Sequence, residues 1–189
     1  RQRQMCIRDR AVGGLHVKSA FLAGIEREFD VDVRKASEAG SVKATSDTFI
    51  RTVPSDIRKR KPGVVVFFMG VNDIINGVEL EGFQEKLQAL VDCTLENGSV
   101  PVLLTVPASY REEYKKKITD LNVAIMKVAK MNYIPLVDVY MLFSRDAKPR
   151  KFYRNEVALK KSGYGRIDAK MLKIFRVIDR YVFKRKSGN

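Results

Sequence analysis

The segment GVVVFFMG, residues 63–70, places the strongest constraint on the fold of this chain. It is a continuous run of β-branched and aromatic residues, which is typical of a strand buried on both faces. Two further runs of this kind follow, VPVLLTV at 100–106 and IPLVDVY at 134–140. Strands buried on both faces belong to parallel sheets that helices cover on each side, so these runs predict an α/β fold.

Helical patterns alternate with these strands. Apolar residues at helical spacing predict helices at about 16–29, 83–95, 118–129 and 167–182. Residues 31–36 predict a short strand, residues 45–60 a helix interrupted near Pro54, and residues 71–82 a loop. The alternation predicts one α/β domain with a mostly parallel sheet, in which ligands bind beyond the carboxyl ends of the strands.

The composition agrees with a globular domain. Hydrophobic residues make up 45% of the 189 residues, and no apolar run approaches the roughly 18 residues of a membrane span. The net charge of +14 favours an anionic partner, such as a nucleic acid or an anionic membrane surface, but it fits a solvated basic surface equally well. We expect no metal ion and no cofactor.

The strand at 63–70 ends in Gly70-Val71-Asn72-Asp73. This segment resembles the Gly-x-Asn-Asp block of the SGNH (GDSL) hydrolases, which are esterases and lipases on a flavodoxin-like three-layer α/β/α sandwich. EAGSVKATS at 38–46 resembles the preceding block, with Gly40 in the glycine position and Glu38 where asparagine is usual. NEVALKKSGY at 155–164 is similar to the last block and keeps its Gly-Tyr pair. The resemblance covers about residues 11–180.

The resemblance implies a serine nucleophile, a histidine base oriented by an aspartate, and an oxyanion hole. The donors of that hole would be the serine N–H, the Gly40 N–H and the side-chain amide of Asn72. An amide suits this role because it donates hydrogen bonds without carrying a charge. The structural alternative for Asn72 and Asp73 is an ordinary turn in which the two side chains satisfy the nearby backbone.

The chain departs from the family pattern at the acid–base residues. Asn155 stands at the position of the usual Asp, and Ala158 at the position of the usual His. The single histidine, His16, lies in the first predicted helix, and we expect it to be a structural residue. Asp146 and Asp168 are further carboxylates, but a carboxylate without an imidazole is a poor base for a serine hydroxyl at neutral pH.

The first ten residues, RQRQMCIRDR, show no apolar periodicity. They match one reading frame of a transposase adaptor used for sequencing libraries, so we expect residues 1–10 to be adaptor-derived and not native. The remaining chain would comprise an SGNH-hydrolase-like domain at 11–183 and a basic tail at 184–189. Counting back from Gly14 places the family's serine at Arg10. We therefore expect the first strand and the nucleophile turn to be missing, which leaves about four strands.

The sequence thus predicts a serine esterase by family that is inactive in this chain, because Ser, Asp and His are absent. The substrate of the native family would be a small ester or an acylated carbohydrate. One alternative is a non-catalytic pseudoenzyme that binds an anionic or acylated ligand. Another is a polyanion-binding protein, with nucleic acid disfavoured because charge runs are usually solvated. Its basic segments would be 58–61, 115–117, 148–154 and 184–186. Substrate, oligomeric state and compartment are not fixed by the sequence.

Overall fold

The computed structural model describes residues 3–9, 23–29, 31–35, 44–146, 149–154 and 159–183. Its centre is a five-stranded sheet in the order β2-β1-β3-β4-β5, and all four strand pairs are parallel. The strands are β1 (Arg3–Asp9), β2 (Val31–Lys35), β3 (Val64–Phe68), β4 (Val100–Leu104) and β5 (Leu136–Val137). Their carboxyl ends meet at one edge, where ligands bind in sheets of this kind.

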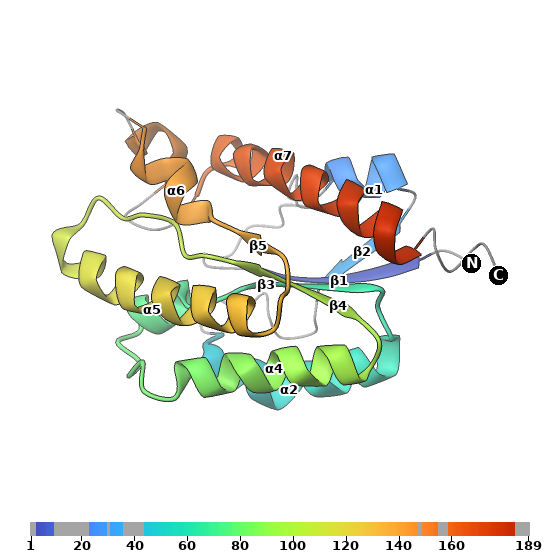
Figure 1. Ribbon diagram of the computed structural model, residues 1–189. Helices are drawn as coiled ribbons and strands as arrows, with labels where there is room; N and C mark the ends of the chain where they lie inside the picture. Colours follow the sequence, from blue (N-terminus) through green and yellow to red (C-terminus); the bar gives the residue numbers. More distant parts are fainter. Residues whose placement is uncertain are drawn as a thin grey trace.

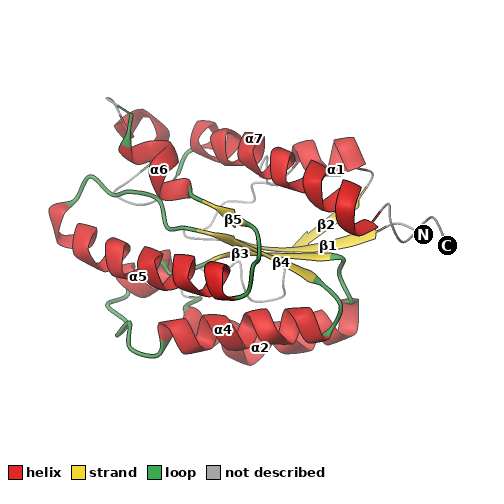
Figure 2. Ribbon diagram, viewed as in Figure 1, coloured by secondary structure: helices red, strands yellow, loops and turns green. Residues whose placement is uncertain are grey.

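Helices cover both faces of the sheet, so the domain has three layers (Figure 1). One face carries α1 (Ala23–Phe29), α6 (Val139–Ser144) and α7 (Lys161–Ile178); the other carries α2 (Ser46–Arg60), α4 (Phe83–Glu96) and α5 (Glu112–Met131). Figure 2 shows the same layers by type of element. The short elements are α3 (Val71–Ile75), the 3-10 turn η1 (Pro149–Phe152) and the π-helical turn η2 (Asp179–Phe183). The predicted flavodoxin-like α/β/α sandwich with a parallel sheet is confirmed.

Alternation along β3 divides the core into two layers. Val65 and Phe67 pack among the helices α2, α4 and α5, whereas Val64, Val66 and Phe68 pack on the side of α7. All five side chains are buried, as a strand covered on both faces requires. None of the described helices is long and apolar enough to span a bilayer.

We expected the first strand to be missing and about four strands to remain. The structure instead has a fifth strand at the central position of the sheet. Residues 3–9 form β1 in the middle of the sheet, where Met5 pairs with Val64 and Arg3 with Val31. The physical reason lies in the two neighbouring strands. Without β1, the N–H and C=O groups of β2 and β3 that point toward it would have no hydrogen-bond partner. Backbone pairing does not depend on apolar periodicity, so a segment without it can still form this strand. The adaptor origin of residues 1–10 stays a prediction.

Three local expectations are corrected as well. The helix expected to break at Pro54 is continuous as α2, because its buried residues Phe49, Val53 and Ile57 hold both halves against the core. The expected loop at 71–82 begins with the helical turn α3. The strand expected at 134–140 is limited to two residues, since Asp138 caps α6 by accepting a hydrogen bond from the Met141 N–H at 3.0 Å.

Candidate active site

The turn after β3 is shaped by a glycine. Gly70 has a φ of +105°, and a Cβ at this position would lie 3.1 Å from Leu121 Cδ1 and 3.3 Å from Val106 Cγ2. Both the backbone conformation and the close packing therefore require glycine. The turn leads directly into α3, so Asn72 and Asp73 stand in its first turn at the carboxyl edge of the sheet.

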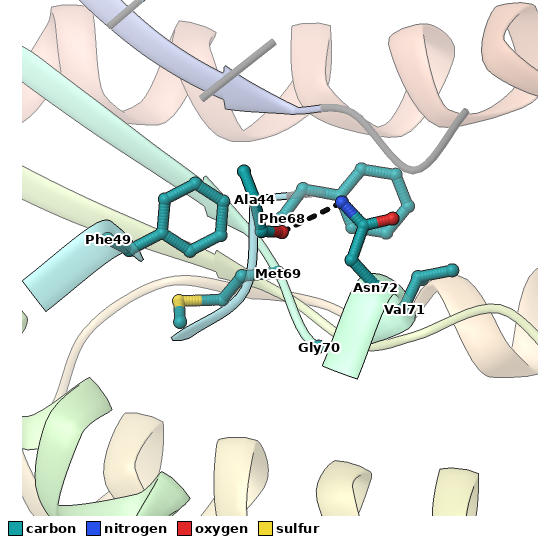
Figure 3. Close-up of a pocket in the computed structure, with 7 residues that line it drawn as sticks. All are labelled: Ala44, Phe49, Phe68, Met69, Gly70, Val71 and Asn72. Carbon is teal, nitrogen blue, oxygen red and sulfur yellow. Dashed lines mark hydrogen bonds between the residues drawn. The ribbon is translucent and has the colours of Figure 1, made fainter. Parts of the chain in front are cut away.

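Asn72 points back across the turn toward the segment that precedes α2. Its side chain is 5% exposed, and Nδ2 donates a hydrogen bond to the Ala44 carbonyl oxygen at 2.8 Å (Figure 3). The amide borders a shallow depression that is partly open to solvent and has room for about one water molecule. The pocket is lined by Ala44, Phe49, Phe68, Met69, Gly70, Val71 and Asn72. A fixed amide donor thus lies beside a mainly apolar depression.

Asp73 binds the start of α2 and is 1% exposed. Its carboxylate accepts hydrogen bonds from the Ser46 N–H at 3.0 and 3.2 Å and from the Ser46 hydroxyl at 2.6 Å. These bonds, together with the positive end of the α2 dipole, compensate the burial of the charge. Asn72 and Asp73 therefore join two distant segments, which differs from the local turn considered as the alternative for this pair.

The loop after β4 is held against α5 by a buried amide. Asn122 accepts from the Val106 N–H at 2.7 Å through Oδ1 and donates to the Val106 carbonyl at 3.0 Å through Nδ2. Sequence reasoning missed this residue. The signal was present, because Asn122 is a polar residue directly after Leu121 on the otherwise apolar face of a predicted helix.

Backbone contacts on both sides of positions 155–158 form a frame for the last block. Tyr153 and Leu159 form an isolated antiparallel bridge, and the Lys160 N–H donates to the Phe152 carbonyl at 2.7 Å. The Tyr153 hydroxyl donates to the Ala108 carbonyl, and burial raises the pKa of this phenol well above its usual value, so it stays protonated. A Cβ on Gly163 would lie 2.9 Å from the Phe152 carbonyl oxygen, which explains the glycine of the Gly-Tyr pair.

With this geometry the sequence can be placed among known proteins. The profile of the GDSL-like lipase/acylhydrolase family matches residues 12–164. The chain belongs to this family. Among proteins with curated functions, none matches the sequence significantly.

Solved structures of GDSL-type hydrolases share the fold. A lipase/acylhydrolase from Enterococcus faecalis superposes with a TM-score of 0.76 at 19% identity, covering 91% of this chain and 94% of the other. The acetyl xylan esterase AlAXEase gives 0.75 at 18% identity, with 90% and 98% covered. The psychrotrophic esterase EstA from Pseudoalteromonas sp. gives 0.70 at 17% identity, with 94% and 100% covered. At these identities the likeness establishes the fold.

The described residues contain only part of the site expected from the family. Asn72 is placed at the carboxyl edge as expected, whereas Gly40, Asn155 and Ala158 lie outside the described residues, as do Arg10 and His16. Gly40 is four positions before Ala44, and the positions 155–158 fall between the bridged residues Tyr153 and Leu159. Within the described ranges no group of three His, Cys, Asp or Glu side chains could hold a metal ion.

Asp146, which the sequence offered as a further carboxylate near the last block, forms two ion pairs. It binds Lys151 Nζ at 3.3 Å and Arg166 Nη1 at 3.0 Å, and it is 14% exposed. Two cations stabilise its charged form and occupy its oxygens. This arrangement makes Asp146 a structural ion-pair centre and leaves it poorly suited to accept a proton from a nucleophile.

Proposed function

We propose that this domain carries the acyl-ester site of a serine esterase, in which Asn72 and Gly40 supply oxyanion-hole donors. The observation that carries the proposal is the buried Asn72 amide, fixed by the Ala44 carbonyl beside the pocket at the carboxyl edge. An amide nitrogen has two hydrogens. The bond to the Ala44 carbonyl fixes the amide plane, and in the transition state an N–H of this amide would donate to the oxyanion.

The same assignment puts the nucleophile at position 10. β1 ends at Asp9, on the edge where Asn72 lies, and position 10 is the next residue in the sequence. In the reaction, a serine oxygen there would attack the acyl carbon as a base at position 158 takes its proton. The negative charge that develops on the carbonyl oxygen would be held by Asn72 and Gly40.

We further propose that the chain as printed does not complete this reaction. Arg10, Asn155 and Ala158 occupy the positions of the nucleophile, the orienting acid and the base. An alanine cannot accept a proton, and the only histidine is His16. The site would then retain charge stabilisation and binding without the proton transfer that usually contributes about 10²–10⁴ to the rate.

The substrate class we propose is a small acyl ester, including acylated carbohydrates. The likeness to an acetyl xylan esterase supports the carbohydrate option. In the printed chain the same pocket would bind such a ligand without cleaving it, which is the pseudoenzyme alternative. Polyanion binding through the basic segments is the competing explanation for the charge, and it predicts a steep loss of binding with salt.

The test uses three proteins and one activated ester, 4-nitrophenyl acetate. The printed chain should show no turnover above buffer, and Arg10→Ser only a small residual rate. Arg10→Ser with Ala158→His should exceed Arg10→Ser by about 10²–10⁴-fold, because the serine then has a base.

Two outcomes would contradict the proposal. High activity of Arg10→Ser alone would mean that another base serves the serine. No gain from Ala158→His, in a protein that keeps its cooperative unfolding, would mean that position 158 does not face the nucleophile position.

A further inference from the structure

The basic segment at 148–154 contains cations of two kinds. Lys151, together with Arg166 of α7, binds the carboxylate of Asp146. Both also lie against the ring of Phe152, with Lys151 Nζ 4.8 Å and the Arg166 guanidinium carbon 4.6 Å from its centroid. These two cations share one carboxylate and pack on an aromatic ring, so they serve the structure of η1 and α7.

Arg150 differs from them. Its guanidinium carbon lies 4.7 Å from the centroid of the Tyr110 ring, and in the part of the chain that the structure describes it forms no ion pair with a carboxylate. Arg150 is exposed. A guanidinium stacked on a ring keeps its N–H groups in its own plane, where they can still donate to a ligand.

The ring below Arg150 is itself anchored. Tyr110 is 37% exposed and meets Tyr153 edge-on, with centroids 6.2 Å apart and an interplanar angle of 89°. Tyr153 is buried, and its hydroxyl donates to the Ala108 carbonyl. Because Tyr110 rests on a fixed neighbour, holding Arg150 on it costs less conformational entropy than holding a free surface arginine.

The pair lies at the edge of the sheet where the site is. Tyr110 belongs to the loop after β4, and Val106 of this loop packs against the turn at Gly70, just before Asn72. Arg150 belongs to η1, which leads through Tyr153 into the positions 155–158. A cation in this place can contact a part of the ligand that extends beyond the reacting ester.

We propose that Arg150 and Tyr110 form a subsite for an oxyanion, a carboxylate or a phosphate, that an ester ligand carries away from its ester bond. The planar fork of an arginine matches the two oxygens of such a group. The assignment to an ester ligand rests on the proposed function of the pocket. The subsite would make the protein prefer anionic ester ligands over neutral ones, while the pocket proposed for the acyl group stays the same.

Binding to the full chain as printed tests the subsite independently of catalysis. Isothermal titration calorimetry would compare monoethyl succinate, which carries one carboxylate, with the neutral diethyl succinate. Monoethyl succinate should bind more tightly. Arg150→Gln should weaken it by about five- to tenfold, and Arg150→Lys by less, because the charge remains while the fork is lost.

Lys151→Gln is the matched control, with the same charge change one residue away at a cation already paired with Asp146. It should alter the affinity less than about twofold. Tyr110→Leu should weaken the binding of monoethyl succinate, because it removes the ring that supports the Arg150 guanidinium. Displacement of monoethyl succinate by inorganic phosphate would assign the subsite to oxyanions in general, and failure of phosphate to displace it would assign the subsite to carboxylates.

Three results would overturn the inference: equal binding of the two succinates, equal losses in Arg150→Gln and Lys151→Gln, or no binding of monoethyl succinate. Thermal unfolding of each variant would show that the fold is kept. Failure of the proposed esterase function is separate, because it would appear as absent turnover in the Arg10→Ser/Ala158→His protein while this binding pattern persisted.

Discussion

In the turn after β3, a single residue stabilises the fold and is also the proposed catalytic group. In the last block, the residues that stabilise the fold differ from those proposed for catalysis. Asn72 ties the turn to Ala44 and is the proposed oxyanion donor. In the last block, Tyr153 and Gly163 hold the backbone, and the proposed acid–base chemistry is assigned to positions 155 and 158. In this assignment the chain keeps the family's residue at Asn72 and has other residues at Asn155 and Ala158. A residue that also stabilises the fold cannot be replaced without a structural cost, but one that serves only the chemistry can.

The largest effect expected from this comparison concerns Asn155. In the Arg10→Ser/Ala158→His protein, adding Asn155→Asp should raise kcat by up to about 10⁴-fold, since the carboxylate fixes the imidazole tautomer and stabilises its charge. In Arg10→Ser alone the same change should have no effect, because these groups act as a unit. Steady-state hydrolysis of 4-nitrophenyl acetate measures both. An equal gain in both backgrounds would show that position 155 acts without the histidine.

Asn72 should show both functions at once. In the Arg10→Ser/Ala158→His protein, Asn72→Ala should lower kcat by about 10²–10³-fold, as the loss of an oxyanion donor usually does. It should also lower the free energy of unfolding by about 1–2 kcal/mol, because the Ala44 carbonyl loses its donor. Asn122→Ala is the control, since that buried amide also satisfies backbone groups. It should destabilise similarly, with a much smaller change in kcat; equal kcat losses would contradict the role of Asn72.

Asp73 should affect stability alone. Asp73→Ala should lower the free energy of unfolding by about 2–3 kcal/mol, because the N–H and hydroxyl of Ser46 would lose their buried acceptor. The control is Asp47→Ala, one residue into the same helix, where the carboxylate is 57% exposed and binds Lys86. That change should cost less than about 1 kcal/mol. Urea unfolding would separate the two, and similar losses would mean that the Asp73–Ser46 bonds do not anchor α2.

The smallest predicted effect is a change in stability at Gly163, which packs against the frame of the last block. Gly163→Ala should cost about 1–2 kcal/mol, because its Cβ would press on the Phe152 carbonyl oxygen and on Leu159. Gly165→Ala, two residues along the same helix with open space around the position, should instead stabilise by about 0.5–1 kcal/mol. Opposite signs in thermal unfolding are the expected result. A neutral Gly163→Ala would mean that the frame can shift without cost.

The sequence allowed the layered parallel sheet and the place of Asn72 to be predicted, because both depend on long apolar runs such as residues 64–68 and on a motif directly after one of them. The partner of Asp73 could not be predicted, since Ser46 is 27 positions away and carries no mark of the contact. β1 was missed because its place is set by the ladders of its neighbours. Arg150 appeared as one charge in a basic run, and only the ring of Tyr110 and the pairing of Lys151 distinguish it.

The central position of β1 also bears on the order in which the protein folds. β1 pairs with two strands at different sequence separations, with Val31 opposite Arg3 and Val64 opposite Met5. The ladder between β1 and β3 therefore closes a longer loop than the ladder between β3 and β4, where Val64 pairs with Val100 across α4. Closing the longer loop costs more entropy, so we expect β3 and β4 to pair before β1 joins β3. The ladder between β1 and β3 would then become protected from hydrogen exchange later than the ladder between β3 and β4.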